Sequence, residues 1–96
     1  MLFRSASFAR QLKPIHWQAL AAFVQGEELS IRLDAIARRE FTTANLMIED
    51  INAFALNSIG DIVIDTADEF PVIEAESMEG IRLLIAWASN KSYLEY

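Results

Sequence analysis

The order of apolar and polar residues predicts a first helix over residues 14–25. Pro14 suits the opening turn of a helix, where a backbone N–H would have no partner inside the helix. Gly26 follows the last turn, a place where the left-handed backbone of a helix cap favours glycine. Between them, apolar side chains recur with helical spacing at Ile15, Leu20, Phe23 and Val24, with Trp17 and Ala21 on neighbouring rows.

A second, shorter helix is predicted from residue 31 to about residue 40, with Ser30 as its N-terminal cap. Asp34 and Arg38 stand four positions apart on it, a spacing at which opposite charges stabilise a helix by about 0.3 kcal/mol. Its apolar positions are Ile31, Leu33, Ile36, Ala37 and Phe41.

The clearest pattern in the chain predicts a third helix over residues 44–59. Thr42 or Thr43 can cap its start, and Gly60 ends it with the positive φ that glycine tolerates. One face carries an apolar stripe and the opposite face is polar, as expected for a helix that lies on a core. The stripe consists of Met47, Ile51, Phe54, Ala55 and Ile59, and the polar row of Asn45, Glu49 and Asn52.

The remainder predicts a β-hairpin followed by a last helix. The β-branched run 61–65 reads as one strand, and Val72 with Ile73 as its return after a polar turn. A hairpin needs support from helices to be stable, and we expect Asn52 to hydrogen-bond its backbone. The last helix opens between residues 74 and 77 and has its apolar stripe at Met78, Ile81, Leu84, Ile85 and Ala88.

These elements predict a helix-rich α+β fold: three helices, a β-hairpin and a C-terminal helix, in a winged-helix-like order. Ninety-six residues are enough for one domain with a modest core. We assign residues 13–89 to that domain, residues 1–12 to a linker or flexible arm, and residues 90–96 to a tail.

Charge is distributed very unevenly along the chain. Residues 40–81 hold ten carboxylates and no Lys or Arg, whereas residues 1–39 hold six basic and three acidic residues. In a winged helix the third helix enters the DNA major groove. Here that helix carries Glu49 and Asp50 and no basic residue, so phosphates would be repelled and we predict no nucleic-acid partner.

The composition narrows the class of protein further. The chain has no cysteine, which excludes disulfides and thiolate metal sites and fits a cytoplasmic location. No apolar run approaches the length of about 18 residues that a membrane-spanning helix requires. His16 is the only histidine, and no nucleophile elbow or glycine-rich phosphate loop accompanies it. We therefore predict no catalytic residues and no enzyme, and expect His16 to pack or to cap its helix.

The segment from the third helix to the last one carries a recognisable order of residues. An acidic residue precedes Ile-Asn, a helix leads to Gly-Asp, and an apolar strand ends in an acid. A proline, two apolar residues and an acidic helix start follow. These features fall on Asp50, Ile51, Asn52, Gly60, Asp61, Ile64, Asp65, Pro71, Val72, Ile73 and Glu76. With them the chain resembles the TerB-C domain, the C-terminal domain of TerB-type tellurite-resistance proteins, over roughly residues 12–85.

The resemblance implies an accessory domain of bacterial proteins linked to tellurite and chemical-stress responses. It also implies acidic residues that chelate a metal ion, at Asp50, Asp61, Asp65 and Glu76. Two departures remove further carboxylates, because Ala53 and Asn57 stand where many members have acids. Two alternatives follow: a merely solvated acidic face with no cofactor, or a weak site for Ca²⁺ or Mg²⁺. For Gly60-Asp61 a purely structural role in the turn is the favoured alternative.

The aromatic residues indicate interaction with another protein. We expect a small core to leave several of them uncovered, and Trp and Tyr are favoured interface anchors. The set is Trp17, Phe23, Phe41, Phe70, Trp87, Tyr93 and Tyr96. The sequence therefore predicts a non-catalytic interaction domain whose partner is a neighbouring domain or a second copy. The alternative is a stand-alone acidic dimer, or an inhibitor that mimics phosphate charge.

Overall fold

Five helices and a short hairpin make up residues 5–90, the part of the chain that this computed structural model describes. With helix covering 71% of that part, the fold is helix-rich α+β as predicted. The elements in chain order are α1 (Ser5–Gln11), α2 (Pro14–Gln25), α3 (Leu29–Arg39), α4 (Ala44–Ser58), β1 (Ile64–Asp65), β2 (Val72–Ile73) and α5 (Ala75–Asn90).

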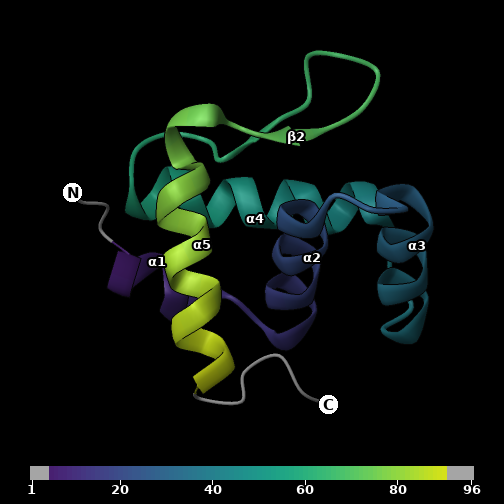
Figure 1. Ribbon diagram of the computed structural model, residues 1–96, viewed down its shortest axis with the longest axis horizontal. Coiled ribbons are helices and arrows are strands. Elements are labelled where there is room, and N and C mark those ends of the chain that lie inside the picture. The colour runs from purple at the N-terminus through teal and green to yellow at the C-terminus, as the bar shows by residue number, and fades with distance from the viewer. Residues whose placement is uncertain (1–4, 91–96) are drawn as a thin grey trace.

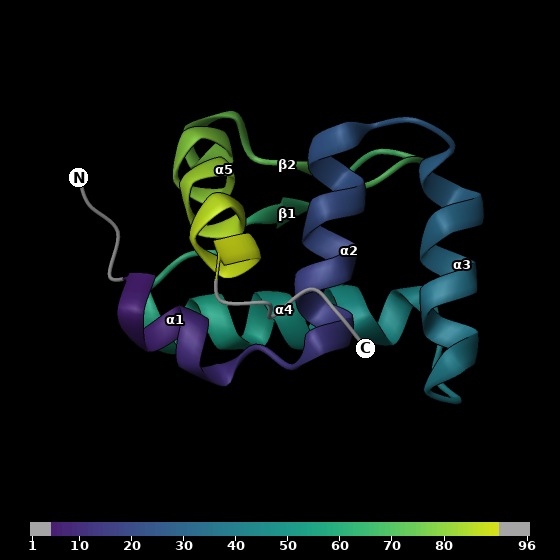
Figure 2. The ribbon, with the colours of Figure 1, turned by 60° about the horizontal axis from the view of Figure 1, so that its bottom comes forward.

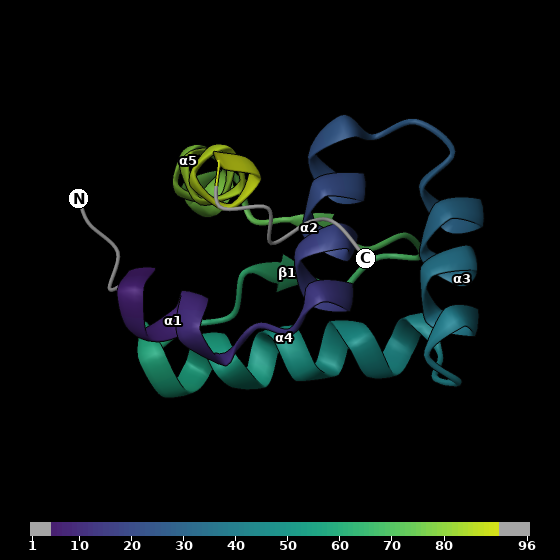
Figure 3. The ribbon, with the colours of Figure 1, turned by 90° about the horizontal axis from the view of Figure 1, so that it is seen from below.

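Helix α2 stands at the centre of the arrangement. It contacts α3, α4, α5 and β2, while α1 packs on α4 and α5. Figure 1 shows the hairpin along the upper edge, and Figure 3 shows α1, α2 and α3 set along α4. The large buried side chains of the core come from elements along the whole described part of the chain: Phe8, Trp17, Leu20, Met47, Ile51, Val63, Ile64 and Ile81. Among residues 5–90, no helix combines the length and hydropathy that crossing a bilayer requires.

The predictions for α2 and α4 are confirmed, including their end signals. Helix α2 spans residues 14–25, and Gly26 closes it in the left-handed conformation with φ of 78°. Helix α4 begins after Thr43, whose side chain accepts a hydrogen bond from the Leu46 N–H at 3.2 Å. Gly60 follows its end with φ of 89°, the positive value expected there.

The start of α3 differs from the prediction. The helix begins at Leu29, and the preceding residue Glu28 has left-handed backbone with φ of 51° and makes no side-chain cap. Ser30 therefore lies inside the first turn and does not cap the helix. Only Glu27 and Glu28 lie between Gly26 and the start of α3, and the left-handed backbone of Glu28 reverses the chain direction there.

Residues 1–12 were predicted as a linker or flexible arm, and the structure differs here. Residues 5–11 form α1, which places Phe8 and Leu12 in the core. The physical reason is the apolar spacing of Phe8, Ala9 and Leu12, which covers the ends of α4 and α5. The predicted tail, 90–96, begins at the last residue of α5 and otherwise lies outside the described residues.

The hairpin is shorter than predicted. Strand β1 holds only residues 64–65 of the run 61–65, and it pairs antiparallel with β2 through Ile64 with Ile73 and Asp65 with Val72. Within residues 5–90 four helices precede this hairpin, where three were expected, and the winged-helix-like order is not confirmed.

Candidate functional site

The four acidic residues predicted as metal ligands lie on four different pieces of structure. Asp50 stands in the middle of α4 with 58% of its side chain exposed. Asp61 lies in the turn after α4, Asp65 ends β1, and Glu76 lies in the first turn of α5. Among residues 5–90, no three His, Cys, Asp or Glu side chains come together as a group that could hold a metal ion.

Two of these carboxylates support the turns in which they sit. Asp61 Oδ1 accepts a hydrogen bond from the Ile62 N–H at 2.8 Å, and Asp65 Oδ1 accepts one from the Ala67 N–H at 2.9 Å. Short polar side chains commonly satisfy loop backbone in this way. The structural role expected for the Gly60-Asp61 pair is thus present, and weak cation binding by the four residues stays a prediction.

His16 lies buried beneath α4. Its Nδ1 accepts a hydrogen bond from the Lys13 N–H at 3.0 Å, which caps the start of α2, and its ring meets Phe54 edge-on at 5.2 Å. The neutral ring therefore carries its proton on Nε2, which lies 3.6 Å from Asp50 Oδ2. That separation is too long for a good hydrogen bond, and the contact becomes one between charges only when the imidazole is protonated.

Burial lowers the pKa of His16 below its ordinary value, because desolvation of the imidazolium outweighs the attraction of Asp50. Nε2 is shielded from solvent and has no hydrogen-bond partner among the described residues. The imidazole thus offers no nitrogen to a substrate at the surface. Packing and capping, the roles expected for His16, are the roles that its contacts give it.

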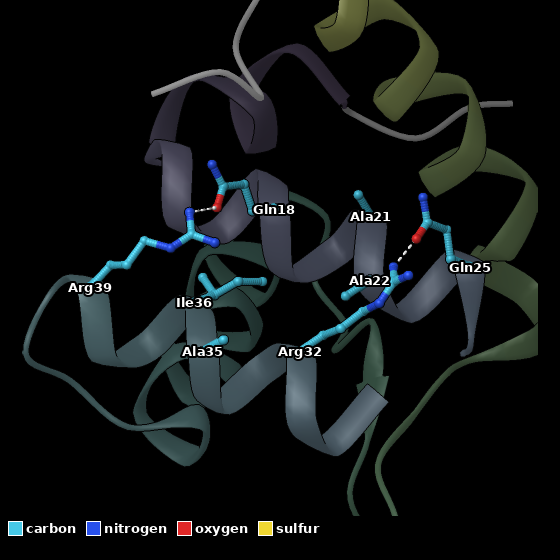
Figure 4. Close-up of a pocket in the computed structure, with 8 residues that line it drawn as sticks. All are labelled: Gln18, Ala21, Ala22, Gln25, Arg32, Ala35, Ile36 and Arg39. Carbon is cyan, nitrogen blue, oxygen red and sulfur yellow. Dashed lines mark hydrogen bonds between the residues drawn. The ribbon is translucent and has the colours of Figure 1, made fainter. Parts of the chain in front are cut away.

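A groove of about 330 Å³ lies along the contact between α2 and α3. Arg32 donates a hydrogen bond to Gln25 Oε1 at one end, and Arg39 donates one to Gln18 Oε1 at 3.3 Å at the other (Figure 4). Ala21, Ala22, Ala35 and Ile36 line the space between, and no carboxylate lines it.

Sequence reasoning missed this cationic groove, although a signal existed. The two arginines and the two glutamines are each seven residues apart, which is two helical turns. When two helices pack antiparallel, a pair of residues with this spacing on one helix can face an equally spaced pair on the other. That α2 packs on α3 was not evident from the sequence of either helix alone.

A second hollow, of about 310 Å³, lies where α3, α4 and the hairpin loop meet. Its walls are mostly apolar and include Leu29, Leu33, Ile48 and Pro71, while Asp34 and Glu69 add negative charge. No Lys or Arg lines it.

The aromatic prediction holds for some residues and is wrong for others. Trp17 and Phe23 are buried in the core, because α2 is covered on several sides. Phe41, Phe70 and Trp87 are 97%, 67% and 42% exposed, and the exposure expected at the hairpin loop is confirmed for Phe70. Tyr93 and Tyr96 lie outside the described residues.

The hairpin and the start of α5 form what we call the acidic hairpin surface, residues 61–79. It carries Asp61, Asp65, Asp68, Glu69, Glu74, Glu76 and Glu79 and no basic residue. Within residues 5–90, none of these carboxylates forms an ion pair with Lys or Arg. Phe70 and Val72 are exposed among them.

The sequence pattern of the TerB-C domain family matches residues 3–82 of the chain. The match covers most of the protein, and the chain belongs to the TerB-C domain family, which is related to tellurite resistance. It includes α1, in keeping with the burial of Phe8 in the core. Comparisons with curated proteins and with solved structures found no match.

Proposed function

We propose that this domain is a non-catalytic interaction module of cytoplasmic proteins in bacterial tellurite and chemical-stress responses. Its acidic hairpin surface binds a basic surface of a partner protein, such as a neighbouring domain. Family membership supports the biological setting. The absence of cysteine fits a reducing compartment.

The observation that carries the proposal is the exposure of apolar side chains among unpaired carboxylates. Val72 is 52% exposed on β2 and Phe70 is 67% exposed in the adjoining loop. Apolar groups supply most of the affinity of an interface core when they are desolvated. The surrounding carboxylates speed the encounter with a basic partner and disfavour acidic ones.

Two other roles for the same carboxylates stay predictions. Weak binding of Ca²⁺ or Mg²⁺ would need oxygen ligands beyond any group found among residues 5–90. A stand-alone inhibitor that mimics phosphate would present its charge to a nucleic-acid-binding protein, and identifying the bound partner separates this role from the proposed one.

Site-specific photo-cross-linking in cells tests the proposal. A benzophenone amino acid is placed at Val72 in one variant and at Leu56 in a matched control, since these side chains are 52% and 54% exposed. Leu56 lies on α4, outside the residues that define the acidic hairpin surface. Position 72 should yield a discrete adduct with another protein, and position 56 should not.

Mass spectrometry of the adduct then identifies the partner and its cross-linked segment. A segment rich in Lys or Arg supports the proposal. Equal labelling at both positions, or no adduct at position 72, would show that the acidic hairpin surface is not a docking site.

A further inference from the structure

Helix α3 has an uncovered outer face. It packs against α2 and α4 on one side and stands at the edge of the molecule (Figure 2, Figure 3). Ile31, Asp34 and Arg38 are exposed, with helical spacing. An apolar residue, an acid and a base are thus arranged in order along one unpartnered stripe.

Phe41, just beyond the end of α3, has a conformation and an exposure that the fold alone does not explain. Its φ is 57°, in the left-handed region that is costly for a bulky residue. The Thr42 N–H donates to the Ala37 carbonyl at 3.0 Å, a pattern of helix ends in which glycine usually occupies the position of Phe41. The ring is 97% exposed and gains nothing from the core. Backbone strain and full exposure together point to a contact outside the chain.

The apolar hollow of about 310 Å³ lies beside the other end of α3. Leu29, Leu33 and Asp34 of α3 form part of its wall. Because acidic side chains line the hollow, it favours an aromatic ring that has positively charged residues near it. Phe41 is such a residue, because Arg38 and Arg39 precede it by a few positions.

We infer that two copies of this chain pair through antiparallel α3 helices, each placing Phe41 at the apolar hollow of the other. An antiparallel pair brings the end of one α3 to the start of the other, as this exchange requires. Two pairs of residues are placed symmetrically about residue 36. Asp34 and Arg38 each lie two positions from it, and Ile31 and Phe41 each lie five positions from it. One register therefore sets Asp34 opposite Arg38 of the second copy and Ile31 opposite Phe41 of the second copy.

Two-fold symmetry makes a second copy the fitting occupant. Every contact occurs twice in an isologous pair, so one apolar insertion and one ion pair per chain become two of each. The pairing uses the outer face of α3 and the hollow beside it, part of whose wall is Glu69, Phe70 and Pro71 of the acidic hairpin surface. The two proposals therefore share one edge of that surface, but pairing is tested on the isolated chain, with no partner protein present.

Sedimentation equilibrium of the 96-residue chain, from about 5 to about 500 µM, tests the pairing. The native chain should show a monomer–dimer equilibrium. Phe41→Gly should weaken it by about tenfold or more, since it removes the inserted aromatic ring from both halves of the interface. This variant keeps the fold, because glycine suits the left-handed backbone at that position, and its thermal midpoint should not fall. Arg82→Glu, an exposed change on α5, serves as the control and should leave the dimer intact.

Charge reversal provides a test that folding defects cannot imitate. Asp34→Arg alone places two like charges opposite each other in the pair, and Arg38→Asp alone does the same with the opposite sign. Each variant should therefore be monomeric by itself. An equimolar mixture should form a heterodimer, because every Arg then faces an Asp in the other copy. A native chain that stays monomeric at the highest concentration overturns the inference, as does a dimer that persists in these variants, or a mixture that does not associate.

Discussion

Asn52 and Ile64 are joined by two hydrogen bonds, which take the place of those that a neighbouring β-strand would make. The Asn52 Nδ2 donates to the Ile64 carbonyl at 2.9 Å, and the Asn52 Oδ1 accepts from the Ile64 N–H at 3.0 Å. Two facing residues of an antiparallel sheet exchange bonds in the same way. The same Oδ1 also accepts from the Val63 N–H at 3.0 Å. One side chain of α4 thus satisfies the edge of β1 that β2 does not cover.

Replacing Asn52 by Ala should destabilise the domain by about 2–4 kcal/mol, because three buried or half-buried backbone groups lose their partner. Urea unfolding followed by circular dichroism measures this change. Asn57→Ala on the same helix is the matched control and should stay within about 0.5 kcal/mol, since that side chain is exposed. A small effect at Asn52, equal to that at Asn57, would mean that water replaces the amide without loss.

His16 should make the domain less stable in mild acid. The unfolded chain takes up a proton on this residue near its ordinary pKa of 6.5, whereas burial lowers the pKa of His16 in the folded chain. Protons then bind the unfolded state preferentially, so this contribution is fully present above about pH 6.5 and is lost as pH falls towards the lowered folded pKa. Because His16 is the only histidine, its imidazole NMR signals report that pKa directly.

The variant Asp50→Asn tests the direction in which Asp50 shifts the pKa of His16. Asp50 raises the pKa of His16, in opposition to desolvation, so its removal should lower the pKa further. The acid-induced loss of stability should then extend to lower pH than in the native chain. An unchanged or higher pKa of His16 in the variant would show that the 3.6 Å contact has no electrostatic effect.

Divalent cations should raise the melting temperature no more than monovalent salt of equal ionic strength if the carboxylates act only as a docking surface. A ligand that binds only the folded state raises the midpoint in proportion to its affinity and concentration. Melts in Ca²⁺, Mg²⁺ and Mn²⁺ against matched NaCl make the comparison. An ion-selective rise that is lost in Asp50→Asn or Glu76→Gln would instead support the metal site implied by the family resemblance.

Local signals predicted the parts of the fold that depend on few neighbours. Pro14 and Gly26 mark both ends of α2, and Thr43 marks the start of α4, because caps and turns are decided by adjacent residues. Asn52 was expected to bond the hairpin, and it does. The packing of α1 was missed because Phe8 and Leu12 gain burial only when α4 and α5 are already in place.

The candidate site was less predictable from the sequence. Asp50, Asp61, Asp65 and Glu76 have the residue types of metal ligands, but whether carboxylates converge is decided by tertiary packing. The exposure of Phe41 and the burial of Trp17 depend in the same way on which helix covers which. The groove between Arg32 and Arg39 arises only when α2 and α3 meet.

Binding of a partner protein to the acidic hairpin surface is proposed to depend on the charge of that surface together with its exposed apolar side chains. Its most direct test repeats the cross-link from position 72 after changing Asp68→Asn, Glu76→Gln and Glu79→Gln, exposed carboxylates without hydrogen bonds among the described residues. These changes remove charge and keep shape. We expect the adduct to fall by about tenfold or more while the fold is retained. An adduct of undiminished yield would contradict the claim.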